Sequence, residues 1–193
     1  MDNSASSYRR FLSGDKEGLA EIIRTHRDSL TLYIFSIVGN MDLAEEIMED
    51  TFVKIYVKKP KYSEKSSFKT WLFSIGKHTA ADHLRKKSRI TVNSYDSIID
   101  ISDEENLEHS AVKNEEKITL HKAIQRLKPD YEQVLYLTFF EEFTNEETAR
   151  IMNKTNKQIR NLLYNAKKAL KAELEEEGFV YENLWRNNSK HFL

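Results

Sequence analysis

The sequence predicts an all-α protein in which two small helical domains are joined by a flexible acidic linker. Apolar residues recur almost everywhere at spacings of three and four, which is the period of an amphipathic helix. Glycine and proline, which interrupt helices, occur only 5 and 2 times in 193 residues. Composition and charge change along the chain, and these changes predict a first domain over 1–90, a linker over 91–117, a second domain over 118–178 and a tail over 179–193.

The net charge of −1 conceals this segregation of charge along the chain. Between Lys54 and Arg89 the chain carries many cations against two acids, Glu64 and Asp82. Between Asp96 and Glu116 it carries many acids and one lysine, Lys113. Few large apolar residues occur in this acidic stretch, so it cannot bury enough surface to fold alone. A linker between two modules follows from this composition.

Composition also excludes several classes of function. A hydrophobic content of 39% is enough for a modest core, and the absence of cysteine removes disulfides, thiolate catalysis and cysteine-based zinc sites. The longest apolar run, Leu32 to Val38, is far shorter than the roughly 20 residues that span a bilayer. The amino terminus has no pattern of an export signal. We therefore expect a cytoplasmic protein without membrane insertion, metal site or cofactor.

Two helices are expected in the first half of the first domain. A stripe of apolar residues from Leu19 to Ile37 ends at Gly39, a good residue for stopping a helix. A second helix is expected to start with Asp42 and Glu45 as an acidic form of the capping box, and to end before Pro60. Its apolar face is opposite a cluster of carboxylates (Glu45, Glu46, Glu49 and Asp50). The cluster is consistent either with a solvated face or with the docking site of a basic protein partner.

The next expected helix follows a polar loop and interleaves aromatic residues with cations. Phe68, Trp71 and Leu84 are among the residues that could pack inward, while Lys69 and Lys77 point outward. Rings that stack on bases and cations that follow phosphates are typical of sites for unpaired nucleic acid. The competing interpretation is that Phe68 and Trp71 are ordinary core residues.

The second domain ends in a pattern that predicts a helix-turn-helix between Phe143 and Lys171. Thr144 with Glu147 and Thr155 with Gln158 each fit the capping box, which fixes two helix starts. Asn153 lies between them, where the first helix must end in a left-handed residue. The second helix has an apolar stripe from Ile159 to Leu170, and its other side carries amide and cationic groups suited to the major groove. An ordinary amphipathic helix in a bundle is the alternative.

These segments, taken together, resemble a known family. DLAEEIMEDTF at 42–52, SSFKTWLFSIGKH at 66–78 with DHLRKKSR behind it, and the carboxy-terminal helix-turn-helix are similar to the extracytoplasmic-function (ECF) group of bacterial sigma-70 factors. The resemblance implies a region 2-like and a region 4-like domain that bind core RNA polymerase at the β′ clamp helices and the β flap. It also implies promoter DNA as a partner and an anti-sigma factor as a regulator.

The resemblance assigns site residues in three groups. Recognition and opening of the −10 element would fall to Lys61, Ser66, Ser67, Lys69, Trp71, Lys77, His78, Arg85, Lys86, Lys87 and Arg89. The −35 element would be read by Thr155, Lys157, Gln158, Arg160 and Asn161, with Tyr164, Asn165 and Lys168 on the DNA backbone. The surface for core polymerase would consist of Asp42, Glu45, Glu46, Glu49, Asp50 and Phe52.

Three positions depart from the family pattern. His78 replaces a frequent asparagine, and Leu162 and Asn165 occupy positions where arginine is common. The −35 module is therefore expected to bind weakly by itself, and attachment to polymerase could offset this. No glycine-rich phosphate loop, nucleophile motif or metal-ligand cluster occurs, so a non-enzymatic specificity subunit is the leading hypothesis. A stand-alone helix-turn-helix regulator is the main alternative, and a protein-interaction adaptor is the third.

Overall fold

A computed structural model describes residues 3–93, 120 and 122–176, and the described part is helical and contains no strand. The named elements are α1 (Ser4–Leu12), α2 (Lys16–Val38), α3 (Met41–Lys58), α4 (Phe68–Asn93), α6 (Pro129–Leu135), η1 (Tyr136–Phe140), α7 (Asn145–Met152) and α8 (Asn156–Glu176). The all-α fold expected from the sequence is confirmed. Most of the predicted linker and the whole predicted tail lie outside the described residues.

The ends of the first helices are set by side-chain caps. Asp15 accepts a hydrogen bond from the backbone of Glu17 and starts α2, which ends at Gly39 in the left-handed conformation. The side chain of Asn40 accepts a hydrogen bond from the backbone of Leu43 and starts α3. The predicted cap from Asp42 and Glu45 is therefore wrong. The amide of Asn40 reaches the exposed backbone donors first, and Asp42 already lies in the first turn.

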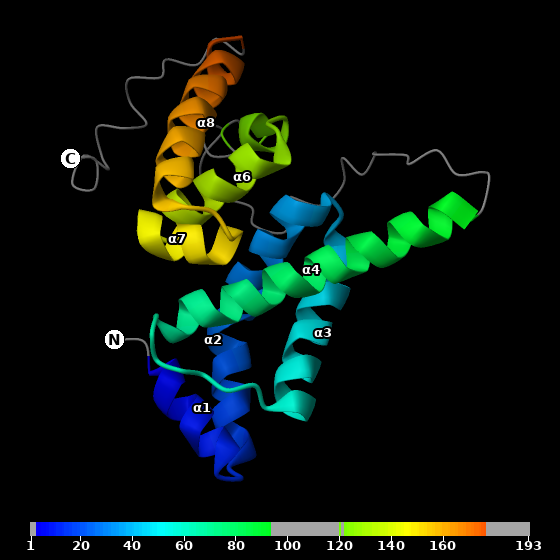
Figure 1. Cartoon of the computed structure of the whole chain (residues 1–193), viewed down its shortest axis with the longest axis vertical. Helices are drawn as coiled ribbons and strands as arrows, with labels where there is room; N and C mark the ends of the chain where they lie inside the picture. Colours follow the sequence, from blue (N-terminus) through cyan, green and yellow to red (C-terminus); the bar gives the residue numbers. More distant parts are fainter. Residues whose placement is uncertain (1–2, 94–119, 121, 177–193) are drawn as a thin grey trace, which may run out of the picture.

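The first module packs α1, α3 and α4 around α2. Its core includes Tyr8, Ile22, Ile34, Ile47 and Phe73, all of which are almost completely buried. α1 and α2 approach closely at Gly18, where an added Cβ would lie 2.2 Å from the carbonyl oxygen of Ser7. Leu84, which was expected to pack inward, is instead 37% exposed, because α4 extends past the helices that cover its first half (Figure 1).

The second module contains α6, η1, α7 and α8. Pro129, the first residue of α6, has no backbone N–H to donate. This costs little there, because a backbone N–H in the first turn of a helix has no acceptor within the helix. The helix then changes to π-helical hydrogen bonding over Tyr136–Phe140, a change that apolar periodicity does not reveal. Ile151, Ile159, Ala166, Leu170 and Leu174 of α7 and α8 are buried.

The two modules lie against each other. α4 packs along α7, and α2 packs against α6, so that α4 crosses the molecule between the two groups of helices (Figure 1). The carboxy-terminal half of α4 projects beyond this contact (Figure 1). None of the described helices combines the length and the apolar content needed to cross a bilayer.

Candidate nucleic-acid interface

The helix-turn-helix has the local geometry predicted for it. Thr144 and Glu147 form a reciprocal capping box at the start of α7. α7 ends at Asn153, whose φ of 53° is the left-handed conformation expected there. At the start of α8, Thr155 accepts from the backbone of Gln158 at 3.2 Å, and Gln158 accepts from the backbone of Thr155 at 2.7 Å. Side chains therefore hold both sides of the turn.

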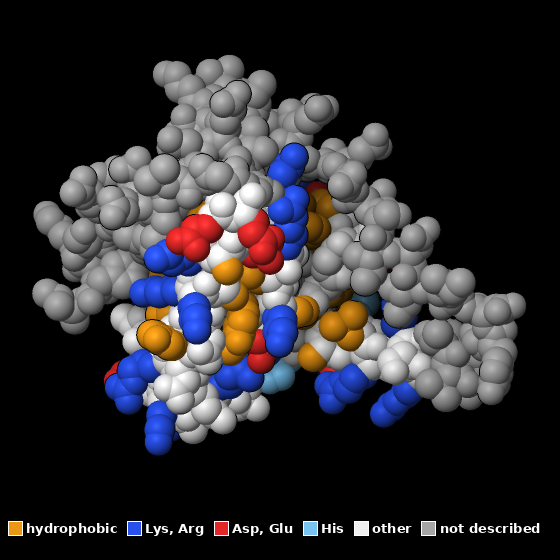
Figure 2. Space-filling model, turned by 90° about the horizontal axis from the view of Figure 1, so that it is seen from above, with side chains coloured by type: hydrophobic (Ala, Val, Ile, Leu, Met, Phe, Trp, Pro, Cys, Tyr) orange, Lys and Arg blue, Asp and Glu red, His pale blue; other side chains and the backbone are white. Residues whose placement is uncertain are grey.

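The outer face of α8 is polar and open. The predicted −35 residues are all exposed: Thr155, Lys157, Gln158, Arg160, Asn161, Tyr164, Asn165 and Lys168. Tyr164 is 71% exposed, so its ring is accessible on this face. Ile159, Ala166 and Leu170 face the core, so the helix is amphipathic as predicted. Lys and Arg side chains are widespread on the face of the molecule seen in Figure 2.

A second cationic surface lies on the projecting half of α4. Arg85, Lys86, Lys87 and Arg89 are exposed there, and His78 in the first half of the helix is exposed as well. Arg85 pairs with Asp82 one turn away, and Lys54 of α3 lies 3.8 Å from the same carboxylate. These two cations hold the pKa of Asp82 below its usual range, although its partial desolvation works in the opposite direction. The rest of this surface remains strongly positive.

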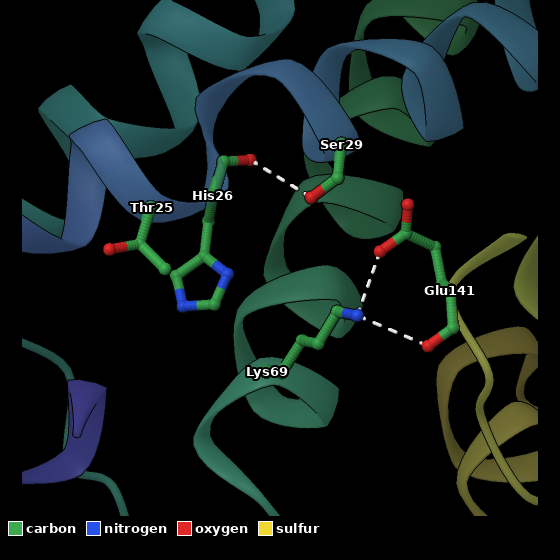
Figure 3. A pocket seen from close by; sticks show the side chains of 5 residues that line it. All are labelled: Thr25, His26, Ser29, Lys69 and Glu141. Atoms are coloured by element: carbon green, nitrogen blue, oxygen red, sulfur yellow. Dashed lines mark hydrogen bonds and ion pairs between the residues drawn. The ribbon is translucent and has the colours of Figure 1, made fainter. Parts of the chain in front are cut away.

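In the first half of α4, two candidate DNA-binding residues, Lys69 and Lys77, contact the second module. Lys69 forms a 2.8 Å ion pair with Glu141 and also donates to its carbonyl oxygen at 3.1 Å (Figure 3). This pair closes one side of a shallow pocket lined by Thr25, His26 and Ser29 of α2 (Figure 3). Lys69 was predicted to face outward, and it is instead partly buried between the two modules.

Lys77 also contacts the second module. Its ammonium group donates a hydrogen bond to the carbonyl oxygen of Met152, in the last turn of α7. Burial lowers the pKa of Lys77, the nearby charge of Lys154 lowers it further, and Asp130 acts in the opposite direction. A cation at the end of a helix satisfies a carbonyl that has no partner inside the helix.

The ring of Trp71 packs against other aromatic side chains. Its ring lies 5.1 Å from those of Tyr8 and Phe68 and 5.4 Å from that of Tyr62. Phe68 is buried, and Trp71 is partly buried against the core. For these two residues the packing interpretation fits the structure better than a ring standing ready to stack on a base. Lys61 is exposed, whereas Ser66 is partly buried.

The acidic face of α3 is also present. Asp42, Glu45, Glu46 and Glu49 are exposed, and Asp50 is partly exposed and lies 2.8 Å from the ring of His83. Phe52, which was grouped with them, is only 5% exposed. Its side chain belongs to the core and is not available at the surface, because it lies on the same side of the helix as Met48 and Ile55.

Sequence reasoning missed an apolar continuation of this acidic face. Val53 and Val57 are 56% and 69% exposed, and they follow Glu46 and Glu49 at helical spacing. The recurrence of positions 46, 49, 53 and 57 at spacings of three and four, with two valines after two glutamates, could have revealed it. The two valines add a small apolar area to the acidic face. No group of three or more potential metal ligands is found within the described ranges.

Comparison with known families accounts for both modules. Residues 22–90, which include α3 and most of α4, match the family model of sigma-70 region 2. Residues 117–170, which include the helix-turn-helix, match sigma-70 region 4. Together the two segments cover more than half of the chain. The protein belongs to the sigma-70 family, in its ECF group.

Similar proteins support the same assignment. This sigma factor is 26% identical over 153 residues to the ECF RNA polymerase sigma factor SigM of Bacillus subtilis, covering 79% of this chain and 92% of the relative. It is 28% identical over 162 residues to RNA polymerase sigma factor SigV of the same organism, covering 82% and 92%. Sigma factors direct promoter-specific transcription initiation, so the alternative of a stand-alone regulator is not favoured.

Two solved structures share the fold. The sigma factor RpoE of Bartonella quintana, crystallised with the anti-sigma factor NepR, aligns with a TM-score of 0.68 at 21% identity, covering 81% of this chain and 96% of that chain. CnrH, solved with the cytosolic domain of CnrY, aligns with a TM-score of 0.60 at 18% identity, covering 90% and 95%. The all-α fold with regions 2 and 4 is thereby confirmed.

Proposed function

We propose that this sigma factor contacts core RNA polymerase through α3, the −10 element through α4 and the loop before it, and the −35 element through α8. The exposed polar face of α8, which contains no acidic residue from Thr155 to Ala172, is the observation that supports this division most strongly. A duplex that lies on it meets amides and a guanidinium near the helix start and lysines further along. Bidentate groups near the start read base edges, and the lysines contact phosphates.

The −10 element is assigned to the other basic surface. Arg85, Lys86, Lys87 and Arg89 hold phosphates, and Ser66, Ser67, Lys69, Lys77 and His78 contact the unpaired strand. Lys61 contributes charge from the loop. Trp71 supports this surface from the aromatic cluster with Tyr8 and Phe68. Opening of the duplex exposes bases, and a groove that combines cations with polar side chains stabilises the separated strand.

The surface for core polymerase is assigned to the outward stripe of α3. Asp42, Glu45, Glu46 and Glu49 supply charge for basic clamp helices of the β′ subunit, and Val53 and Val57 supply apolar contact. Phe52 fixes the helix from beneath. Region 4 is expected to meet the β flap. No catalytic step, metal or cofactor is proposed, and the protein acts where RNA polymerase does, in the cytoplasm. An anti-sigma protein is the proposed regulator.

The test is reconstitution of transcription. Purified protein is added to core polymerase on a library of promoter fragments, and transcripts are sequenced. The proposal expects transcripts from a restricted set of promoters that share elements near −35 and −10. Sequence-specific DNA binding that is unaffected by core polymerase, without transcripts, would support the stand-alone regulator. Binding to polymerase without promoter selection would support the adaptor.

A further inference from the structure

The segment between α3 and α4, residues 59–67, has no regular secondary structure, but several contacts fix its course. In this α3–α4 loop the hydroxyl of Tyr62 donates to the carbonyl of Ser66 at 2.6 Å, and the ring of Tyr62 packs edge to face on Phe68 at 5.4 Å. Glu64 has a φ of 59°, a left-handed conformation that a residue with a side chain keeps only where its surroundings hold it. The loop therefore has a defined shape in the free protein.

α1 holds the loop at two further points. Tyr8 is only 1% exposed, and its hydroxyl donates to the carbonyl of Pro60 at 2.6 Å. Burial raises the pKa of Tyr8 to about 12, so the hydroxyl keeps its proton and remains a donor at neutral pH. Arg9 forms a 3.0 Å ion pair with Glu64. The loop runs past α1 on its way from α3 to α4, and two neighbouring residues of α1 contact it there (Figure 1).

α1 is itself anchored on α2. The hydroxyl of Ser7 donates to the carboxylate of Glu21 at 2.7 Å, and Arg10 pairs with the same carboxylate at 3.1 Å. α1 precedes residues 22–90, the part that matches sigma-70 region 2, so the family match gives it no role. Because α1 is fixed to α2, a loop that is tied to α1 is tied to the core of the first module.

We propose that α1 positions the α3–α4 loop for the −10 element, with Tyr8 and Tyr62 as positioning residues that do not touch DNA. This inference rests on the proposed function, which assigns the loop and the start of α4 to the unpaired strand. Lys61 and Ser67 are exposed, whereas the two tyrosine rings pack into the aromatic cluster with Phe68 and Trp71. The two hydroxyl groups fix the backbone, and the fixed backbone presents the exposed side chains to the base.

A loop of fixed shape discriminates between bases better than a loop that adapts. A site rejects the wrong ligand when binding it causes a clash or leaves polar groups unpaired, and movement of the loop relieves both penalties. A shape fixed in advance also reduces the entropy that is lost when the strand binds. Loss of one tie should therefore reduce the preference for the correct base more than it reduces the total amount of transcript.

The ion pair with Arg9 has a second effect, because Glu64 is the only acidic residue of the loop. An unpaired carboxylate on a surface for DNA repels the phosphates of the strand. The guanidinium of Arg9 approaches this carboxylate from α1 and neutralises it. Arg9 is thus a positioning residue that acts through Glu64.

The first test measures the shape of the loop without DNA or polymerase. Trypsin cleaves after Lys61 and Lys65, and cleavage requires the loop to leave its tied shape. Tyr8→Phe and Tyr62→Phe keep the rings and remove only the hydroxyl groups, and each is expected to make cleavage at these lysines about fivefold faster. Tyr56→Phe, at a half-exposed tyrosine of α3, is the control and should be cleaved at the wild-type rate. Equal rates in all four proteins would overturn the proposal.

The second test measures base preference with core polymerase. The full-length protein and core enzyme transcribe a promoter library with a randomised −10 element and a constant −35 element. In Tyr8→Phe and Tyr62→Phe the ratio of transcripts between the preferred base and the next is expected to fall about fivefold. Partial unfolding would lower all transcripts in proportion and leave this ratio unchanged. Tyr56→Phe should keep the wild-type ratio, and a library randomised at −35 should give the wild-type preference in every variant.

Charge compensation tests the role of Arg9. Arg9→Ala leaves Glu64 unpaired and is expected to reduce promoter opening about threefold, because the loop then repels the strand. Glu64→Gln in the same protein removes the charge and should restore opening. Opening that stays low in the double variant would overturn the role given to Arg9.

These outcomes separate the inference from the proposed function on which it rests. Wild-type protein that yields no promoter-specific transcripts with core polymerase contradicts the proposed function. Selective transcription by the wild type, with the same −10 preference in both tyrosine variants, overturns this inference alone.

Discussion

Lys77 of α4 donates a hydrogen bond to the carbonyl oxygen of Met152, and this contact joins the first module to the last turn before the recognition helix. The residues are 75 positions apart in the sequence. The same lysine belongs to the surface assigned to unpaired promoter DNA. One side chain therefore has two possible partners, and the two cannot be bound together.

Substitution of Lys77 should consequently have opposite effects in two assays. Lys77→Ala is expected to weaken the contact between the modules, which increases the distance between fluorophores placed at Ser63→Cys and Ala172→Cys in the free protein. In reconstituted transcription it is expected to reduce promoter opening, because a DNA contact is lost. Lys86→Ala should reduce opening without a change of distance. An unchanged distance in the Lys77 variant would show that the hydrogen bond does not hold the modules together.

Reversal of charge on the projecting half of α4 should separate opening from polymerase binding. Lys86→Glu with Lys87→Glu places two acids on an exposed surface of α4. Promoter opening, measured by permanganate reactivity of unpaired thymines, is expected to fall about tenfold or more because phosphate contacts are replaced by repulsion. Affinity for core polymerase should not change. Equal loss of both would contradict the separate roles of α3 and α4.

The acidic stripe of α3 should control association with core polymerase. Glu46→Lys with Glu49→Lys reverses two exposed charges and is expected to weaken binding about tenfold, or roughly 1.4 kcal/mol. Added salt should weaken binding of the wild type more than that of the variant, since fewer attractive charges remain. Asp28→Lys, at a carboxylate with 95% side-chain exposure on α2, is the control. If the double variant and the wild type bind core polymerase with equal affinity, the stripe is an ordinary solvated face.

Loss of Arg160 should weaken recognition of the −35 element. Arg160→Ala removes an exposed guanidinium near the start of α8 and is expected to cost about 1 to 3 kcal/mol in binding to a −35 duplex. The unfolding free energy should change by less than about 0.5 kcal/mol, because the side chain is exposed. Fluorescence anisotropy and thermal unfolding measure the two quantities. As a control, Lys58→Ala removes an exposed cation from α3, in the first module, and should leave duplex binding unchanged.

Glu132 should make the stability of the protein depend on pH. Burial raises the pKa of its carboxyl from 4.5 to about 8. Below pH 4.5 the group is protonated in both the folded and unfolded states, and it costs nothing. As pH rises to about 8, the unfolded state releases its proton first, so the contribution of this group to stability is lost over that window. Above pH 8 the loss is complete.

Glu132→Gln should remove this dependence. At pH 8 the variant is expected to be more stable than the wild type by about 1 to 3 kcal/mol, and near pH 4.5 the two should be nearly equal. Urea unfolding at several pH values gives the comparison. Glu176→Gln, at an exposed position in α8, should keep the wild-type slope. If the unfolding free energy of the Glu132 variant fell with pH as steeply as that of the wild type, this carboxyl would be ionised normally.

Local signals in the sequence were sufficient for the helices and for the helix-turn-helix. The capping pairs Thr144–Glu147 and Thr155–Gln158 and the helix end at the left-handed Asn153 depend on residues three or four positions apart, and the structure contains all of them. The exposed face of α8 followed from the same periodicity. The start of α3 was misplaced because two polar residues only two positions apart, Asn40 and Asp42, can both cap a helix, and the sequence does not rank them.

The sequence alone determined an all-α chain with two modules of separated charge and a helix-turn-helix, because caps, helical periods and charge runs act between neighbours along the chain. Only the tertiary structure decided which of the candidate DNA-binding residues are open. Ser67 meets Glu147 across 80 positions, and Lys69 meets Glu141 across 72. Such contacts depend on how the surfaces of the two modules fit together. In the same way, the helices that pack against α3 determine that Phe52 is buried and that Val53 is exposed.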